Sequence, residues 1–199
     1  IQTIFFGGGT PNALKITTIE SIMSVIHSCF DTSELIEFSM EMNPGIHSIK
    51  KLREIVSQGV TRISVGVQSF DDQLLQLYGR NHTGSDARQF VLDCQSMGVH
   101  SVSVDLMFGH PNQPLLVIDQ ACEEISKLNV QHASIYGLTI EPNTPYYHQG
   151  MVVNDDHQGD QYRHIQQGLV DQGFDQYEVS NFSKPGFECR HNIKYWTFQ

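Results

Sequence analysis

Short strand patterns alternate with helical patterns along almost the whole chain. The strand patterns lie at residues 1–6, 35–42, 62–68, 101–108, 133–139 and 176–181. The helical patterns between them lie at residues 19–26, 49–58, 71–78, 85–97, 115–128 and 156–172. Neighbouring parallel strands need a long crossover connection, which is usually a helix. The alternation therefore predicts an α/β fold built on a parallel sheet.

The side chains within each strand pattern divide into an apolar face and a polar face. In residues 62–68, Ile63 and Val65 fall on one face, whereas Arg62, Ser64 and Gln68 fall on the other. A doubly wound sheet is apolar on both faces, and an ordinary barrel is filled by branched aliphatic side chains. We therefore expect a partial barrel with helices outside and a polar ligand inside. An antiparallel sheet with one wet face is the alternative, which the helical spacers disfavour.

The first strand pattern stops at the glycine-rich segment Gly7-Gly8-Gly9-Thr10-Pro11. Glycine allows positive φ and close approach of the backbone, so free N–H groups here can bind an anionic or zwitterionic group. A tight turn capped by Thr10 is the plainer interpretation. A phosphate-binding P-loop is excluded because no Gly-Lys-Ser/Thr follows. A dinucleotide fingerprint is excluded because Asn12 replaces its third glycine.

Polar residues follow or end four consecutive strand patterns. They are the segment Gly7–Thr10, then Glu41, Gln68 and Asp105. The carboxyl ends of parallel strands meet at one rim, which is where such folds place their chemistry. One such residue often only caps the next helix, but four on consecutive units predict a ring of donors and acceptors around a polar ligand.

Composition narrows the class of partner. The chain has 199 residues, a formal net charge of −10 and a pI near 5.3, which argues against nucleic acid or an anionic membrane as partner. It has no apolar run long enough to span a bilayer and no secretory signal, so we expect a cytoplasmic protein with at most transient membrane contact. Its four cysteines are far apart, and Cys29, Cys94 and Cys122 are expected to be core thiols on helices.

Eight segments occur in an order and spacing typical of one family. They are FFGGGTP (5–11), EMNP (41–44), RISVGVQSF (62–70), GRNH (79–82), VDLMFGHP (104–111), LTIEPNTP (138–145), YEVSNFSKPG (177–186) and ECRHNIKYW (188–196). Over nearly its whole length the chain resembles the radical SAM family of oxygen-independent coproporphyrinogen III oxidases, and within it the HemW-type haem chaperones. The resemblance implies a partial (β/α)6 TIM-like barrel over residues 1–145, lacking its first strand. It implies a C-terminal extension over residues 146–199, with a helix, a strand and an irregular aromatic tail.

The resemblance also implies a set of S-adenosylmethionine (SAM) contacts. The glycine-rich segment matches the turn that holds the methionine amino group, through Gly8, Gly9 and Thr10. Further contacts are implied for Glu41, Gln68, Arg80 and Asp105, and a weaker backbone contact for Thr139. A carboxylate suits ribose hydroxyls or an ammonium group, and an arginine suits the SAM carboxylate.

The HNIKYW segment matches a motif associated with haem binding in this branch. His191 would be an axial ligand of the haem iron, with Tyr195 and Trp196 beside the porphyrin. Cys189, as a thiolate, is an alternative ligand. A histidine that merely packs against Trp196 is the structural alternative.

The family holds a [4Fe–4S] cluster with a CxxxCxxC motif upstream of GGGTP, and this chain contains no such motif. We expect a fragment that also lacks the C-terminal domain and performs no radical chemistry alone, so no catalytic residue is assigned. His110 and Pro114 depart from the family pattern near Asp105. Two functions remain open: a chaperone that binds haem and SAM and delivers haem to an acceptor protein, or an oxidase that decarboxylates porphyrinogen propionates.

Overall fold

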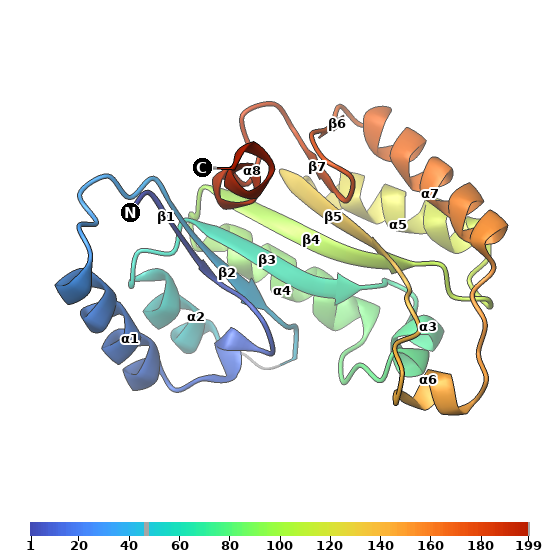
Figure 1. Cartoon of the computed structure of the whole chain (residues 1–199), viewed down its shortest axis with the longest axis horizontal. Coiled ribbons are helices and arrows are strands. Elements are labelled where there is room, and N and C mark those ends of the chain that lie inside the picture. Colours follow the sequence, from blue (N-terminus) through green and yellow to red (C-terminus); the bar gives the residue numbers. More distant parts are fainter. Residues whose placement is uncertain (46–47, 199) are drawn as a thin grey trace.

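The computed structural model describes residues 1–45 and 48–198 (Figure 1). The strands are β1 (Thr3–Phe6), β2 (Glu37–Met42), β3 (Arg62–Gln68), β4 (Ser101–Phe108), β5 (His132–Gly137), β6 (Asp175–Gln176) and β7 (Asn181–Ser183). The helices are the 3-10 helix η1 (Pro11–Ala13), α1 (Ile16–Cys29), α2 (Ile49–Val56), α3 (Asp72–Leu77), α4 (Gly84–Ser96), α5 (Leu115–Leu128), α6 (Pro145–His148), α7 (Asp155–Val170) and α8 (Arg190–Thr197).

The strands form one sheet in the order β1-β2-β3-β4-β5-β7-β6. Strands β1 to β5 are mutually parallel, and β7 and β6 add an antiparallel edge. The predicted α/β fold with a parallel sheet is confirmed. Because β7 pairs with β5, one sheet continues across residue 145, where we expect the barrel to give way to the extension. That division itself stays a prediction.

The two faces of the sheet differ as the alternation predicts. The apolar face packs against α1, α2, α4, α5 and α7, and its strand residues Phe38, Ile63, Val65 and Val104 are fully buried in a single core. The opposite face carries serines and charged groups, and α8 lies over one end of it (Figure 1). Burial of the apolar face stabilises the sheet, so the polar face is left available for binding.

Several element boundaries match the sequence patterns, and two regions do not. Strands 62–68 and 101–108 and helix 115–128 have the predicted bounds. The single strand predicted at 176–181 is wrong, because residues 177–180 form a turn between β6 and β7. The tail predicted to be irregular forms helix α8 at residues 190–197, whereas Gln199 lies outside the described residues. Helix α8 starts where the carboxylate of Glu37 accepts hydrogen bonds from its first N–H groups, and a local sequence pattern does not show such a distant contact.

Two details of the first helix differ from what its sequence indicates. Thr17 and Glu20 have the spacing of a capping box, but α1 starts at Ile16 after Lys15, which makes no side-chain capping bond. Cys29, at the end of α1, is exposed, whereas Cys94 and Cys122 are buried as predicted. Cys29 is the last residue of the helix, whose buried residues are Ile19 and Met23. No helix in the described residues is both long and apolar enough to cross a membrane.

Candidate functional site

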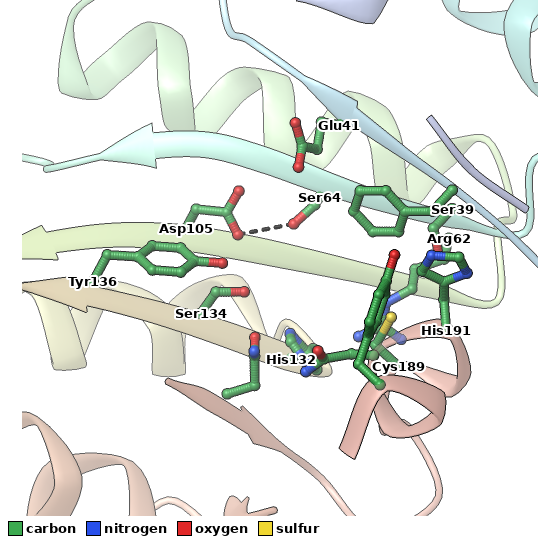
Figure 2. Close-up of a pocket in the computed structure, with 14 residues that line it drawn as sticks. Ser39, Glu41, Arg62, Ser64, Asp105, His132, Ser134, Tyr136, Cys189 and His191 are labelled. Carbon is green, nitrogen blue, oxygen red and sulfur yellow. Dashed lines mark hydrogen bonds between the residues drawn. The ribbon is translucent and has the colours of Figure 1, made fainter. Parts of the chain in front are cut away.

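Two adjoining cavities lie on the polar face of the sheet. The strand-end cavity has a volume of about 250 Å³ and is lined by Gly9, Asn43, Gly66, Gln68 and Arg80. The α8 cavity has a volume of about 230 Å³ and is lined by Phe5, Ser39, Arg62, Ser64, His132, Ser134, Cys189, His191, Asn192 and Tyr195 (Figure 2). Three side chains line both cavities, namely Glu41, Asp105 and Tyr136. The barrel interior is therefore polar, as expected, and none of these lining residues has a branched aliphatic side chain.

The glycine-rich turn is held against the second strand. The Gly8 N–H donates to Oε2 of Glu41 at 2.8 Å, and Gly8 and Gly9 have φ of +77° and +61°. A Cβ on Gly7 would lie 2.6 Å from the Phe5 ring and 3.0 Å from Oε1 of Glu41. Glycine is therefore required here by conformation and by space. In this structure the Gly8 N–H is already paired with a protein carboxylate.

Asn43 connects three parts of the strand-end cavity. Its Nδ2 donates to Oγ1 of Thr10 at 2.9 Å, and its Oδ1 accepts from Nη1 of Arg80 at 3.4 Å. A Cβ on Gly66 would lie 2.5 Å from that Oδ1, so the glycine makes room for the amide. Asn43 therefore positions Arg80, whose guanidinium lines the cavity.

Gln68 is directed into the cavity by an irregular strand end. It has a φ of +65°, and the register between β3 and β4 shifts between Val65 and Gln68. Non-glycine residues with positive φ are uncommon and cluster at functional sites. The irregularity ends β3 and places the amide beside Arg80 among the cavity's lining residues.

Asp105 lies within β4, three residues before its end, so the expectation that it ends a strand is wrong. Leu106 pairs with Gln68, and this register brings Asp105 level with the end of β3 because β4 extends further. Its Oδ1 accepts from Oγ of Ser64 at 2.8 Å. Burial raises the pKa of Asp105 to about 6. Hydrogen bonds from Ser64 and Ser134 lower this pKa, whereas the negative charge of Glu41 raises it further.

The strand-end cavity brings together five of the eight residues predicted to contact SAM: Gly9, Glu41, Gln68, Arg80 and Asp105. Gly8 lies beside them through its bond to Glu41. Thr10 lies outside the cavity's lining and accepts a bond from Asn43 instead of capping η1 with its side chain. Thr139 is exposed and does not line either cavity. His110, the departure near Asp105, is fully buried between Tyr78 and Tyr146.

His191 is oriented by groups on β1 and on its own helix. Its Nδ1 lies 2.9 Å from Oγ1 of Thr3, and its ring stacks on Phe5 with centroids 5.2 Å apart. Tyr195, four residues later on α8, meets the same ring edge-on at 5.4 Å. Burial lowers the pKa of His191, so the imidazole is neutral near pH 7. When Nδ1–H donates to Thr3, the lone pair of Nε2 is free for a metal.

The start of α8 is held by Glu37, a buried carboxylate on β2. Its Oε2 accepts from the Arg190 N–H at 2.9 Å, and its Oε1 accepts from the His191 N–H at 3.0 Å. Oε1 also accepts from Sγ of Cys189 at 3.3 Å and from Oγ of Ser39 at 3.1 Å. A carboxylate satisfies the free N–H groups of a helix start and favours its dipole. Burial raises the pKa of Cys189, which disfavours the thiolate and hence its role as an iron ligand.

Sequence reasoning missed Arg62 and Asn43 as site residues. Arg62 was placed on the polar face of its strand but given no role, although a charged residue at a position facing a barrel interior is unusual enough to be a signal. Asn43 follows the strand pattern 35–42 and begins the segment Asn43-Pro44-Gly45, which is typical of a turn. Its role becomes visible only through contacts with Thr10 and Arg80, which are distant in sequence.

Together, the parallel strands, the outer helices and the polar lining residues define a partial α/β barrel with a cavity at its strand ends. The radical SAM superfamily matches residues 1–139. The chain belongs to this superfamily, which is characterised by SAM and a [4Fe–4S] cluster.

Curated relatives match the whole chain. It is 38% identical over 199 residues to the heme chaperone HemW of Haemophilus influenzae, covering 100% of this chain and 52% of that protein. It is 35% identical over 203 residues to the heme chaperone HemW of Bacillus subtilis, covering 99% of this chain and 54% of that protein. The chain thus spans about half the length of the curated relatives it matches.

A solved structure shows the same fold. The radical SAM enzyme coproporphyrinogen III oxidase (HemN) of Escherichia coli superimposes with a TM-score of 0.84 at 19% identity, covering 99% of this chain and 46% of that one. At this identity the likeness concerns the fold alone.

The two cofactors of the superfamily fit the described residues differently. The strand-end cavity offers a guanidinium, two carboxylates and two amides, a set of donors and acceptors that suits an amino acid joined to a nucleoside. In contrast, no three histidine, cysteine or acidic side chains within residues 1–45 and 48–198 are grouped as metal ligands. The described part of the chain therefore does not fit an iron–sulfur cluster.

Proposed function

We propose that this chain is the SAM- and haem-binding part of a HemW-like haem chaperone that delivers haem to an acceptor protein. The curated relatives that match its whole length are named heme chaperones. The observation that carries the proposal is His191, a neutral imidazole at the wall of the α8 cavity whose Nδ1 is paired with Thr3. Iron-ligating histidines are commonly oriented by a bond to their other ring nitrogen.

The surroundings of His191 suit a porphyrin. Phe5 and Tyr195 flank the imidazole, and the side chains of Tyr195 and Trp196 are 72% and 55% exposed on α8. Exposed aromatic rings can stack on a flat ligand such as a porphyrin.

The four cysteines are all free, and we place the protein in the cytoplasm on that basis.

The SAM part of the proposal concerns the strand-end cavity. Arg80 would bind the carboxylate of the methionine moiety, while Glu41 and Asp105 would bind its ammonium group or the ribose hydroxyls. The glycines of the turn allow the ligand to approach the backbone. Thr10 and Thr139 stay predicted contacts of SAM. Thr10 is linked to the cavity by its hydrogen bond with Asn43, and Thr139 would contact SAM through its backbone.

The test of haem binding is a titration followed by the absorption spectrum of haem. Replacing His191 with alanine is expected to weaken binding at least tenfold and to change the spectrum, because the axial nitrogen is lost. A matched control is the exposed pair His27 and Thr32, whose Nδ1 and Oγ1 lie 3.0 Å apart. His27→Ala is expected to leave binding unchanged. An unaltered spectrum in His191→Ala would exclude this ligand.

Thr3 is expected to tune the same site. Thr3→Val keeps the shape of the side chain but removes the partner of Nδ1, and losing such a partner typically weakens metal binding by about 10- to 100-fold. Thr32→Val is the corresponding control at the exposed pair. Equal affinities for Thr3→Val and the unaltered protein would show that the contact does not orient a ligand.

Gly66 tests the strand-end cavity. Gly66→Ala would place a Cβ 2.5 Å from Oδ1 of Asn43, displacing the amide that holds Arg80. We expect SAM affinity, measured by calorimetry, to fall about tenfold, equivalent to about 1.4 kcal/mol. Gly159→Ala on α7 is the control, since its added Cβ would meet only Arg163 at 3.6 Å. Unchanged SAM affinity in Gly66→Ala would contradict the assignment.

The oxidase alternative is tested by turnover. The cluster and SAM, when bound together in a radical SAM enzyme, supply the one-electron chemistry that an oxidase needs. Consumption of coproporphyrinogen III by the protein with both cofactors would contradict a chaperone role alone. Haem binding without such turnover would support the chaperone.

A further inference from the structure

Arg62 is a buried cation that the proposed roles of the two cavities leave unused. It begins β3, is only 4% exposed and lines the α8 cavity. Its Nη1 donates to Oγ of Ser101 at 3.1 Å and to the carbonyl oxygen of Phe187 at 2.9 Å. Its Nη2 is buried and has no hydrogen-bond partner in the described part of the chain.

No carboxylate in the described residues forms an ion pair with this guanidinium. Glu37 is near enough to influence the pKa of Cys189, as Arg62 also does, but its carboxylate oxygens bind the N–H groups at the start of α8 and not the guanidinium. An arginine remains charged in proteins, and a buried charge without a partner is destabilising. An arginine kept in this state is explained if a ligand supplies the missing anion.

The surroundings of Arg62 indicate which anion this is. Figure 2 shows Arg62 at the end of the cavity where His132, Cys189 and His191 gather, away from Asp105 and Tyr136. Ser39 and Asn192 also line the cavity, and their hydroxyl and amide groups can donate to a bound anion. A guanidinium with neighbouring hydroxyl and amide donors is the usual environment of a bound carboxylate.

The size of the cavity limits how much of a ligand enters. Its volume of about 230 Å³ lies below the range of about 300–1,000 Å³ in which drug-sized ligands bind. A macrocycle is too large to enter, but an aliphatic arm ending in a carboxylate is not. Such an arm would pass beside Phe5 and His191, which line the same cavity.

We propose that the α8 cavity is a carboxylate-binding subsite in which Arg62 pairs with a propionate arm of the haem held by His191. The identity of the arm rests on the proposed function, whereas the affinity of Arg62 for a carboxylate does not. The second arm would remain outside this cavity, whose volume is about 230 Å³.

The main experiment compares haem with its dimethyl ester, in which both propionates are neutral. The unaltered protein is expected to bind haem about tenfold more tightly than the ester. In Arg62→Gln this preference is expected to disappear, with the affinity for the ester and the spectrum from His191 retained. Arg62→Lys keeps the charge and is expected to restore most of the preference. Equal binding of haem and ester by the unaltered protein would overturn the proposal.

Two further measurements separate the possible failures. If Arg62→Gln does not fold, the comparison of haem and ester in the unaltered protein and in Arg62→Lys decides the result. If neither haem nor ester binds the unaltered protein, the proposed function fails, and sodium propionate alone tests the subsite by nuclear magnetic resonance titration. Propionate binding that weakens about tenfold in Arg62→Gln would then assign the site to a free carboxylate. Identical titrations of the two proteins would overturn the subsite.

Discussion

Replacing Glu37 with alanine is expected to lower the free energy of unfolding by about 3–5 kcal/mol, because two backbone N–H groups each lose a charged acceptor at a cost of about 1–3 kcal/mol. The carboxylate is 6% exposed and accepts four bonds, two of them from the backbone at the start of α8. Without it, the N–H groups of Arg190 and His191 lose their partner. Urea unfolding measures the loss, and hydrogen exchange shows whether it is concentrated in residues 190–197.

Two further variants make the Glu37 result specific. Glu37→Gln keeps the size of the side chain and one acceptor oxygen, but its amide N–H₂ faces the donor N–H groups of α8, so we expect a loss of intermediate size. Glu34→Ala removes an exposed carboxylate just before β2 and is expected to change stability by less than about 0.5 kcal/mol. Equal losses in Glu34→Ala and Glu37→Ala would contradict the anchoring role.

Asp105→Asn is expected to stabilise the ligand-free protein above pH 6. The folded pKa of Asp105 is raised to about 6, and the ordinary value is near 3.8, so the folded state binds more protons between these values. Stability from this group is therefore greatest below about pH 4 and falls as pH rises to about 6. Two pKa units correspond to at most about 2.7 kcal/mol, and we expect about 1–2 kcal/mol because the carboxyl borders a cavity open to water.

The pH profile distinguishes this effect from general repacking. Asp105→Asn should be more stable than the unaltered protein at pH 7.5, and the difference should vanish near pH 4. Ser64→Ala removes a bond that favours the ionised carboxyl, so its stability should fall more steeply as pH rises. Asp175→Asn at the exposed edge strand is the control. A difference between Asp105→Asn and the unaltered protein that is constant from pH 4 to 8 would contradict the assignment.

The fold was predictable because local periodicity and long-range packing agree. Residues 62–68 alternate between aliphatic and polar side chains, and the structure buries Ile63 and Val65 against helices while Ser64 faces the hollow. The same alternation excludes a doubly wound sheet. Glu41, Gln68 and Arg80 were also predictable as one site, because strand ends converge and the family segments name them.

The remainder depends on contacts that no local pattern contains. Helix α8 starts where a carboxylate from β2 reaches its N–H groups, 153 residues away in sequence for Arg190. The turn at residues 177–180 replaces a strand whose pattern was too short to separate from its flanks. Asn43 has an unremarkable position beside Pro44, and its importance comes from Thr10 and Arg80. In each case tertiary contacts decide the local structure, and such contacts can override the secondary-structure propensity of the segment.

The three side chains shared by the two cavities would couple the binding of the two proposed ligands energetically. Asp105 stands between Arg80 in one cavity and Arg62 in the other, and both guanidinium groups interact with it electrostatically. An anion that neutralises Arg62 makes ionisation of this carboxyl harder, and so changes how strongly the strand-end cavity holds a cationic group. By thermodynamic reciprocity, whatever factor one occupant imposes on the affinity of the other is returned unchanged. Cargo and nucleoside would then report on each other's presence without any movement of the backbone.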